Sequence, residues 1–304
     1  MRSIDLRIGT RGSALAQAQT GLVIRALAAA GVRARTVIVE TAGDIRSPDT
    51  SWGEGAFVAA IEEALVAGSV DLAVHSAKDV PTDVDPRLII AAYLTRADPR
   101  DALVVRAGLG PGLDDLPPGA RIGTDSPRRT GFLLAHRPDL DVRPLHGNVD
   151  TRLRRLDDGA ADALILACAG LDRLGLADRI AERLDPRMLP PAAGQGAVAV
   201  QVRSDDQETI DLVRAVDDAD TRLVVETERA FLTASGGGCR APIGAHAELS
   251  GTAVDLFGGY VAADGSDVQF GQVRGRIHDA PALARELAMS LRSITTGRRA
   301  AMPS

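Results

Sequence analysis

Residues 7–10 read RIGT, and the same four letters return at residues 121–124. A second motif follows each copy, GSVD at residues 68–71 and GAAD at residues 159–162, and each stands before an apolar run. Around these motifs, short β-rich segments alternate with helical patterns, which is typical of a mostly parallel α/β sheet. The repeat therefore predicts two similar α/β lobes.

The rest of the chain predicts a third, smaller α+β domain. A helix at residues 221–234 leads through a run of three glycines into strands at 254–261 and 268–276, and a helix at 281–291 follows. The segment ADG at residues 263–265 is a turn signal that would join the two strands as a hairpin. The elements expected in the two lobes are strands at 6–10, 37–40, 71–75, 121–124, 142–145 and 163–167, and helices at 14–30, 57–66, 127–136 and 151–157.

Composition excludes several classes of protein. A net charge of −6 argues against a nucleic-acid binder, and an aromatic content of 3% argues against base-stacking platforms. No run approaches the roughly 20 apolar residues that cross a bilayer, and the first residues lack the apolar core of a signal peptide. Two distant cysteines without a CxxC motif predict neither a disulfide framework nor a metal site. We therefore expect a cytoplasmic protein.

Arginines recur where a predicted strand gives way to a predicted helix. Ligands bind at these junctions in open α/β sheets, because free N–H groups and a partial positive charge lie there. A cation in the first helical turn costs roughly 0.3–1 kcal/mol, which a bound anion would offset. Guanidinium groups bind carboxylates at two points, so a ligand with several carboxylates is one interpretation. The other is a set of solvated arginines paired with nearby aspartates. The residues concerned are Arg11 with the expected N-cap Ser13, Arg128 and Arg129 with the expected N-cap Ser126, and Arg152.

The segment DLAVHSAKDVP at residues 71–81 is an apolar strand that ends in a polar turn and a proline. It carries Lys78, the only lysine in the chain, next to Asp79. A carboxylate fixed at a cleft suits proton transfer or the stabilisation of a cation. A surface ion pair of little energetic value is the alternative. We interpret His75 as a buried histidine without a catalytic role.

The two cysteines have different settings. Cys168 follows an apolar run and is expected to fill space in the core. Cys239 lies in GGGCRAP at residues 236–242, on a pliable loop beside a guanidinium group. Such a setting favours the thiolate and its reaction with an electrophile, although a lone loop cysteine is often incidental.

Taken in chain order, these motifs resemble the signatures of the porphobilinogen deaminase (hydroxymethylbilane synthase) family, and they cover most of the chain. They are GTR at residues 9–11 with Ser13 and Gln19, VHSAKDVP at 74–81, DPRD at 98–101, SPRR at 126–129, GN at 147–148, TR at 151–152, AGL at 169–171 with Arg173, GQGA at 194–197 and GGC at 237–239.

The resemblance implies two lobes like those of periplasmic binding proteins and a small α+β domain with the cysteine on a loop. The expected domains are residues 1–96 plus 197–216 for the first lobe, 97–196 for the second lobe, and 217–304 for the domain that carries Cys239. The first lobe would take a return strand near residues 197–203. A monomer is expected.

The resemblance also implies the chemistry. Cys239 would hold a dipyrromethane cofactor as a thioether, and Asp79 would be the catalytic residue that protonates the departing amine and stabilises cationic intermediates. Four porphobilinogens would be joined head to tail with loss of ammonia, and hydrolysis would release the linear tetrapyrrole. The other cofactor-binding residues would be Lys78, Ser126, Arg128, Arg129 and Arg152, and the substrate-binding residues would be Arg11, Ser13, Gln19, Arg173 and His146.

Four positions depart from the pattern of the family. His146 stands where arginine is common, Asp125 replaces a small residue, Glu54 lies in a loop that is usually basic or neutral, and Ala42 replaces arginine. Glu54 and Asp125 add negative charge near the expected site of a polyanion. Two alternatives therefore stay open: a diverged paralogue that acts on a related pyrrole, and a non-catalytic two-lobed module that binds anions.

Overall fold

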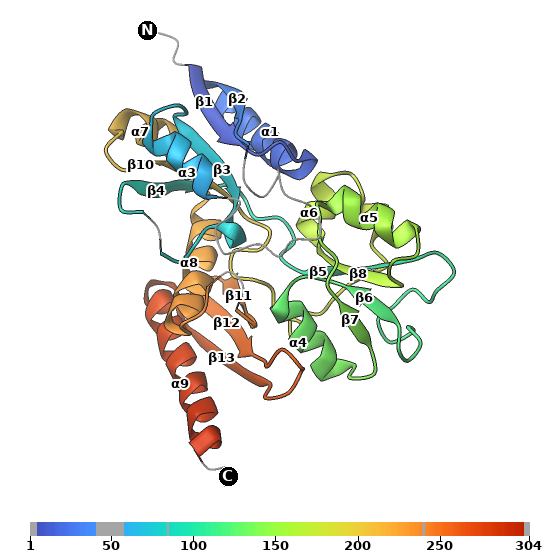
Figure 1. Cartoon of the computed structure of the whole chain (residues 1–304). Coiled ribbons are helices and arrows are strands. Elements are labelled where there is room, and N and C mark those ends of the chain that lie inside the picture. Colours follow the sequence, from blue (N-terminus) through green and yellow to red (C-terminus); the bar gives the residue numbers. More distant parts are fainter. Residues whose placement is uncertain (1–4, 41–57, 84, 239–240, 301–304) are drawn as a thin grey trace.

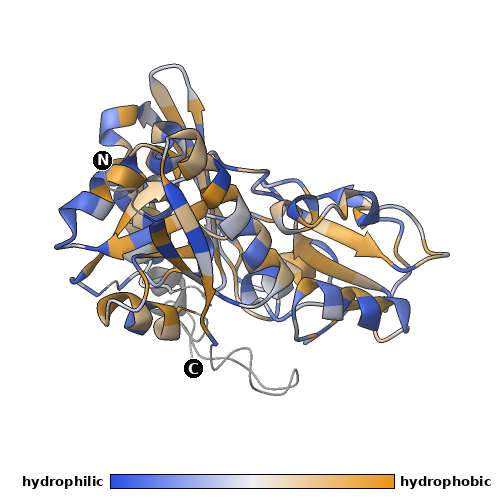
Figure 2. Cartoon of the chain, turned by 90° about the horizontal axis from the view of Figure 1, so that it is seen from above, coloured by the Kyte–Doolittle hydropathy of each residue, from blue (hydrophilic) through white to orange (hydrophobic). Residues whose placement is uncertain are grey.

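The computed structural model describes residues 5–40, 58–83, 85–238 and 241–300, with side chains described up to residue 292. The path of the chain is shown in Figure 1, where two lobes and a C-terminal domain can be followed by colour. Apolar strands lie between helices with hydrophilic outer sides (Figure 2).

Lobe 1 is built on a five-stranded sheet in the order β2-β1-β3-β10-β4. The first three strands run parallel, whereas β10 is antiparallel to both β3 and β4. The strands are β1 (Asp5–Thr10), β2 (Arg33–Ile38), β3 (Leu72–Ser76), β4 (Leu88–Tyr93) and β10 (Val198–Arg203), and the helices are α1 (Ala14–Ala29), α3 (Ala59–Val66) and α7 (Gln207–Arg214). The return strand implied by the family resemblance is β10.

Lobe 2 repeats this arrangement in the order β7-β6-β8-β5-β9. Here β6 is parallel to β7 and β8, and β5 is antiparallel to β8 and β9. The strands are β5 (Asp101–Val105), β6 (Arg121–Gly123), β7 (Asp141–Arg143), β8 (Ala163–Ala167) and β9 (Glu182–Arg183), and the helices are α4 (Pro127–His136), α5 (Val149–Asp157) and α6 (Cys168–Arg173). Four of the five strands in each sheet point the same way, as the sequence predicts, and the exception is the strand that follows the crossing from the other lobe, β10 in lobe 1 and β5 in lobe 2.

The repeated sequence motifs form the same clamp in both lobes. In lobe 1, Arg7 donates from its backbone N–H to Asp71 Oδ2 at 2.7 Å and from Nη2 to Oδ1 at 2.6 Å. In lobe 2, Arg121 makes the same two contacts with Asp162, both at 2.9 Å. The clamp ties the start of one parallel strand to the start of its neighbour, which explains why RIGT and the later aspartate recur together.

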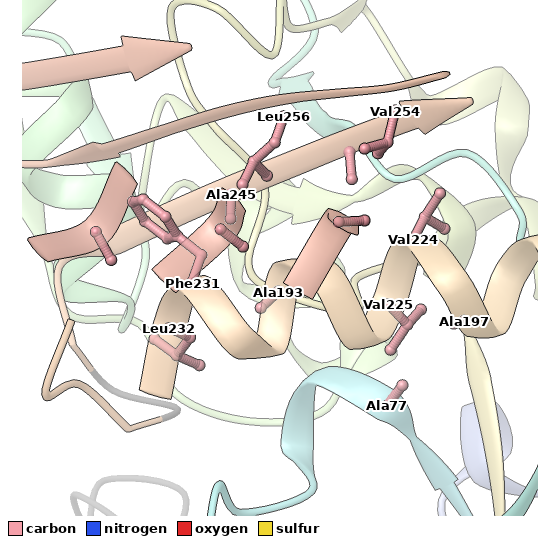
Figure 3. Close-up of a cluster of buried hydrophobic side chains, with 14 of the residues drawn as sticks. Ala77, Ala193, Ala197, Val224, Val225, Phe231, Leu232, Ala245, Val254 and Leu256 are labelled. Carbon is pink, nitrogen blue, oxygen red and sulfur yellow. The ribbon is translucent and has the colours of Figure 1, made fainter. Parts of the chain in front are cut away.

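The C-terminal domain packs two long helices, which contact each other, against the same face of a three-stranded antiparallel sheet, and it reaches back to lobe 1. Its core includes Phe231 and Val225 of α8 with Leu256 of β12, and Ala77 of lobe 1 belongs to the same cluster. Figure 3 shows α8 between the strand that carries Leu256 and the segment that carries Ala77. The elements are α8 (Ala219–Ala234), β11 (Ile243–Ser250), β12 (Ala253–Tyr260), β13 (Gln269–Arg276) and α9 (Ala280–Ala300), and the expected hairpin is β12–β13.

Two chain segments cross between the lobes, residues 94–100 and 184–197, and α8 holds both. Arg96 of the first segment pairs with Glu228 of α8 at 2.8 Å. Gly194 of the second segment donates its backbone N–H to the same carboxylate at 2.8 Å. Burial alone would raise the pKa of Glu228, but the charges and hydrogen bonds of Arg96 and His246 together outweigh it and lower that pKa. Glu228 is therefore an ionised anchor at the junction of the two lobes and the C-terminal domain.

Candidate active site

A cavity of about 230 Å³ is lined by both lobes. It lies where β3 of lobe 1 and β8 of lobe 2 end and the chain turns into the next helix. The predicted site residues that line it are Arg11, Ser13, Gln19, Lys78 and Asp79 from lobe 1, and Arg129 and Arg152 from lobe 2. Of the others, Arg128, Ser126, Arg173 and His146 lie outside the lining.

Lys78 and Asp79 occupy the short 3-10 helix η1 (Ala77–Asp79) directly after β3. The strand is buried, and the chain turns into the cavity at its carboxyl end, as the sequence predicts. Lys78 Nζ donates to Gln195 Oε1 at 3.1 Å. Burial lowers the pKa of Lys78 to about 8, with a further contribution from the charge of Arg129. Lys78 is therefore mostly protonated at neutral pH and loses its charge at mildly alkaline pH.

Gln195 is a site residue that the sequence analysis did not single out. Its Nε2 donates to the Pro99 carbonyl at 2.7 Å and to Asp101 Oδ1 at 3.0 Å. Because both amide hydrogens are used, the side-chain carbonyl has to face Lys78. The motif GQGA was part of the family resemblance, but nothing in the sequence showed which way this amide points.

Asp101 is the second residue that was missed, and it is the partner of Arg128 and Arg129. Its side chain is fully buried at the start of β5 and lies 2.8 Å from Arg128 and 2.7 Å from Arg129. Burial alone would raise the pKa of Asp101, but the two guanidinium groups outweigh it and lower that pKa to about 2. The anion opposite this arginine pair is thus a carboxylate of the protein. Arg128 also donates to the Pro190 carbonyl at 2.6 Å and Arg129 to the Ile165 carbonyl at 2.8 Å.

The start of α1 is fixed as the sequence predicts. Ser13 caps the helix by accepting from the Ala16 backbone N–H. Gln19 is buried and donates to Ser76 Oγ at 2.9 Å, which ties α1 to the end of β3. In lobe 2, Ser126 caps α4 in the same way, through the backbone N–H of Arg129. Both serines therefore have a structural role in orienting the helix starts at the cavity.

His146 and Asp125, two of the departures noted in the sequence, lie side by side. His146 Nδ1 is 2.9 Å from Asp125 Oδ1, and Arg152 Nη2 is 3.1 Å from Asp125 Oδ2. Arg152 also donates from Nε to the Gly147 carbonyl at 2.8 Å. Arg173 lies outside the lining of the cavity and donates to the Gly196 carbonyl at 2.6 Å.

Two further residues are buried, Cys168 in the core and His75 in the wall of the cavity. His75 is buried, its Nε2 lies 3.0 Å from Gln201 Oε1, and burial lowers its pKa to about 4, so the ring is neutral at pH 7. Cys168 is fully buried, and burial raises the pKa of its thiol to about 11. Both findings agree with the sequence interpretation.

Comparison with known proteins assigns this arrangement to a family. Residues 6–211 match the family model "Porphobilinogen deaminase, dipyromethane cofactor binding domain", and residues 222–293 match "Porphobilinogen deaminase, C-terminal domain". The chain belongs to the porphobilinogen deaminase family. A porphobilinogen deaminase of Nocardia farcinica is 48% identical to this chain, and the aligned region covers 94% of this chain and 85% of the relative. One of Roseiflexus castenholzii is 47% identical and covers 94% of this chain and 95% of its own.

Solved structures outside the porphobilinogen deaminase family show a weaker likeness. The methionine-binding protein MetQ covers 77% of this chain and 96% of its own, with 14% identity and a TM-score of 0.47. The VFT2 domain of BvgS from Bordetella pertussis covers 70% of this chain and 86% of its own, with 18% identity and a TM-score of 0.41. The two-lobed fold described above rests on the strand orders of this chain.

The cavity suits the carboxylate-bearing dipyrromethane cofactor of porphobilinogen deaminases. Among its lining residues, arginine and lysine outnumber aspartate four to two. Asp101 and Asp125 offset part of this positive charge at Arg129 and Arg152, but cations still face the cavity from both lobes, and guanidinium groups are suited to two-point binding of carboxylates. The residues that would hold the group are Arg11, Lys78, Arg129 and Arg152.

The cysteine expected to carry the cofactor, Cys239, lies outside the described residues, as do Glu54 and Ala42. Its neighbour Gly238 is described and lines a hollow together with Pro81, Thr82 and Asp83, the segment that follows Asp79. Arg229 of α8 holds that segment by donating to the Val80 carbonyl at 2.9 Å and the Pro81 carbonyl at 2.6 Å. The chain just before Cys239 is thus adjacent to the loop that carries Asp79.

Proposed function

We propose that this chain is a hydroxymethylbilane synthase that joins four porphobilinogens head to tail on a dipyrromethane primer. Each step breaks the C–N bond of an aminomethyl group, releases ammonia and forms a C–C bond to the free α-carbon of the terminal pyrrole, which loses its proton. Hydrolysis then releases the linear tetrapyrrole. The observation that carries the proposal is a cationic cavity around Asp79 in a chain that matches the family over nearly its whole length.

The residues divide between charge binding and proton transfer. Arg11, Lys78, Arg129 and Arg152 bind the acetate and propionate groups, while Asp101 fixes the positions of Arg128 and Arg129 from behind. Asp79 holds the proton given to the leaving amine and stabilises the positive charge that develops on the pyrroles. The dipyrromethane, when bound, supplies the first free α-carbon. The diverged paralogue and the anion-binding module are less well supported, because curated porphobilinogen deaminases are 45–48% identical over 94% of the chain.

The role of Asp79 is tested with Asp79→Asn, which keeps the shape and removes the charge. Turnover, measured as ammonia release from porphobilinogen, is expected to fall about 100-fold or more, the scale of a lost acid–base group. Folding and retention of the primer should be unchanged. Asp85→Asn is the matched control, because Asp85 lies in the same connection but pairs with Arg87 at the surface. Near-normal turnover of Asp79→Asn would refute the assignment.

The attachment of the cofactor to Cys239 is tested by intact mass and peptide mapping. We expect a dipyrromethane adduct on Cys239 and none on Cys168, because the Cys168 thiol is fully buried and stays protonated. Cys239→Ser should remove both the adduct and the colour with an aldehyde reagent for pyrroles, whereas Cys168→Ala should keep them. Active protein with unmodified Cys239 would contradict the proposal.

Several further statements belong to the proposal. The domains are residues 1–96 plus 197–216, residues 97–196 and residues 217–304, a division supported by the membership of β10 in the sheet of lobe 1. The protein acts as a cytoplasmic monomer and binds no nucleic acid. Within the described part of the chain, the structure contains no helix with the length and hydrophobicity needed to span a bilayer.

A further inference from the structure

Asp125 and His146 meet because the strands before them are neighbours. β6 and β7 run parallel, so the residues that follow them emerge at the same edge of the sheet. The pairing continues one step beyond the strands, where the Thr124 backbone N–H donates to the Arg143 carbonyl at 3.0 Å. Asp125 Oδ1 and His146 Nδ1 are then 2.9 Å apart, and each side chain is 19% exposed.

The same carboxylate holds a cation of the cavity. Asp125 Oδ2 accepts from Arg152 Nη2 at 3.1 Å, and Arg152 is one of the residues that line the cavity. Arg152 also donates from Nε to the Gly147 carbonyl, so among the described residues these two contacts use two of the five N–H donors of the guanidinium. Asp125 therefore occupies one edge of an arginine that faces the substrate.

Neither Asp125 nor His146 is needed to start the neighbouring helices. The N-cap of α4 is Ser126, whose hydroxyl accepts from the Arg129 backbone N–H. The N-cap position of α5 is taken by Asn148. A requirement of local helix structure thus does not account for the Asp125–His146 contact, whereas its position against Arg152 relates it to the cavity.

We propose that Asp125, held by His146, is an internal carboxylate that weakens the grip of Arg152 on the carboxylates of the growing pyrrole chain. This inference rests on the proposed function. A substrate carboxylate on Arg152 has to share the guanidinium with Asp125, and two carboxylates on one cation repel each other. The His146 ring, with Nδ1 2.9 Å from Oδ1 of Asp125, keeps that carboxylate from turning fully towards Arg152 and so limits this competition. Asp125 and His146 are positioning residues that set affinity, and they take no part in proton transfer.

The test begins with Asp125→Asn, which keeps the shape and removes the competing charge. The KM for porphobilinogen is expected to fall about fivefold, the equivalent of roughly 1 kcal/mol. Partly elongated enzyme–substrate complexes should persist longer in native mass spectra recorded after a fixed amount of substrate. The control is Asp157→Asn, which removes a carboxylate paired with Arg179 at 2.7 Å on the same lobe but away from the cavity.

A double-mutant cycle separates this role from a merely structural one. His146→Ala should raise KM in the wild-type background, because Asp125 is then free to engage Arg152 fully. In the Asp125→Asn background the same change should leave KM unaltered. Circular dichroism melts should show that all three variants fold.

The possible failures are distinguishable. Wild-type protein that releases no ammonia from porphobilinogen would overturn the proposed function and this inference together. The inference alone would be overturned if the wild-type protein is active but Asp125→Asn leaves KM unchanged or raises it. It would also be overturned if the elongation complexes of Asp125→Asn persist no longer than those of the wild type. Equal effects of His146→Ala in both backgrounds would do the same, because His146 would then act independently of Asp125.

Discussion

Replacing Asp101 with asparagine should destabilise the fold more than any exposed aspartate replacement. The change removes the only carboxylate paired with Arg128 and Arg129 among the described residues, and both guanidinium groups are buried. Removal of one partner from a buried ion pair costs about 3–5 kcal/mol, because the remaining charge is left uncompensated. We therefore expect Asp101→Asn to lower the free energy of unfolding by roughly that amount at pH 7.

The acid dependence of stability gives an independent estimate. The pKa of Asp101 is lowered to about 2 from an ordinary value of 3.8, a difference worth roughly 2 kcal/mol. Since the folded-state pKa is depressed, this stabilisation is fully present above about pH 4 and is lost as the pH falls towards 2. Wild-type protein should lose it over this interval, and Asp101→Asn should lack this component of the pH dependence.

The measurement is urea denaturation followed by circular dichroism at pH 7 and at steps between pH 4.5 and 2.5. Asp85→Asn is the control, because the pKa of Asp85 is also lowered to about 2, by hydrogen bonds from Arg87, but the side chain is solvated. We expect no measurable change for that variant. A loss below about 1 kcal/mol for Asp101→Asn would refute the reasoning, because such a value is typical of a surface pair.

Three further predictions concern the groups around the cavity and the interlobe junction. The KM for porphobilinogen should rise as the pH increases through about 8, where Lys78 loses its charge. Lys78→Arg should move this rise in KM to higher pH. A pH profile of KM that is the same in the variant would contradict the role of Lys78. Gln195→Leu removes the acceptor that holds Lys78 and should lower kcat/KM about tenfold, roughly one charge-assisted hydrogen bond, whereas unchanged kinetics would exclude a positioning role. Glu228→Gln leaves Arg96 without its buried partner and should cost about 3–5 kcal/mol in urea denaturation, and a change near zero would show that the anchor is dispensable.

The fold was predictable where the sequence repeats itself and less so for strands that stand outside the repeat. The recurrence of RIGT indicated β1 and β6, and both lie at equivalent places in sheets of the same order. The strands β4 and β5 were not expected, because short apolar runs without alternation look alike in strands and helices. Their position depends on pairing with strands that are distant in the chain, and a local sequence pattern does not predict such pairing.

The site shows the same division. The helix starts at Ser13 and Ser126 follow local rules of capping, so they were predicted correctly. The partner of Arg129, a residue of α4, is Asp101, which lies 28 residues earlier at the start of β5. One signal in the sequence could have indicated this pairing. Asp101 directly precedes the apolar run ALVV, and an aspartate next to a buried strand is unusual unless it forms a buried ion pair.

The route of β10 has a consequence for synthesis on the ribosome. Among the described strands, β10 is the one partner of β4 in the sheet of lobe 1, and β10 is translated after the strands described in lobe 2. While lobe 2 is being translated, β3 and β4 each have an unpaired edge, and unpaired strand edges are prone to pair with other chains. The nascent chain therefore finishes its second lobe before its first, and a chain cut short before residue 198 keeps an unsealed lobe 1 in which Lys78 and Asp79 lie beside an exposed strand.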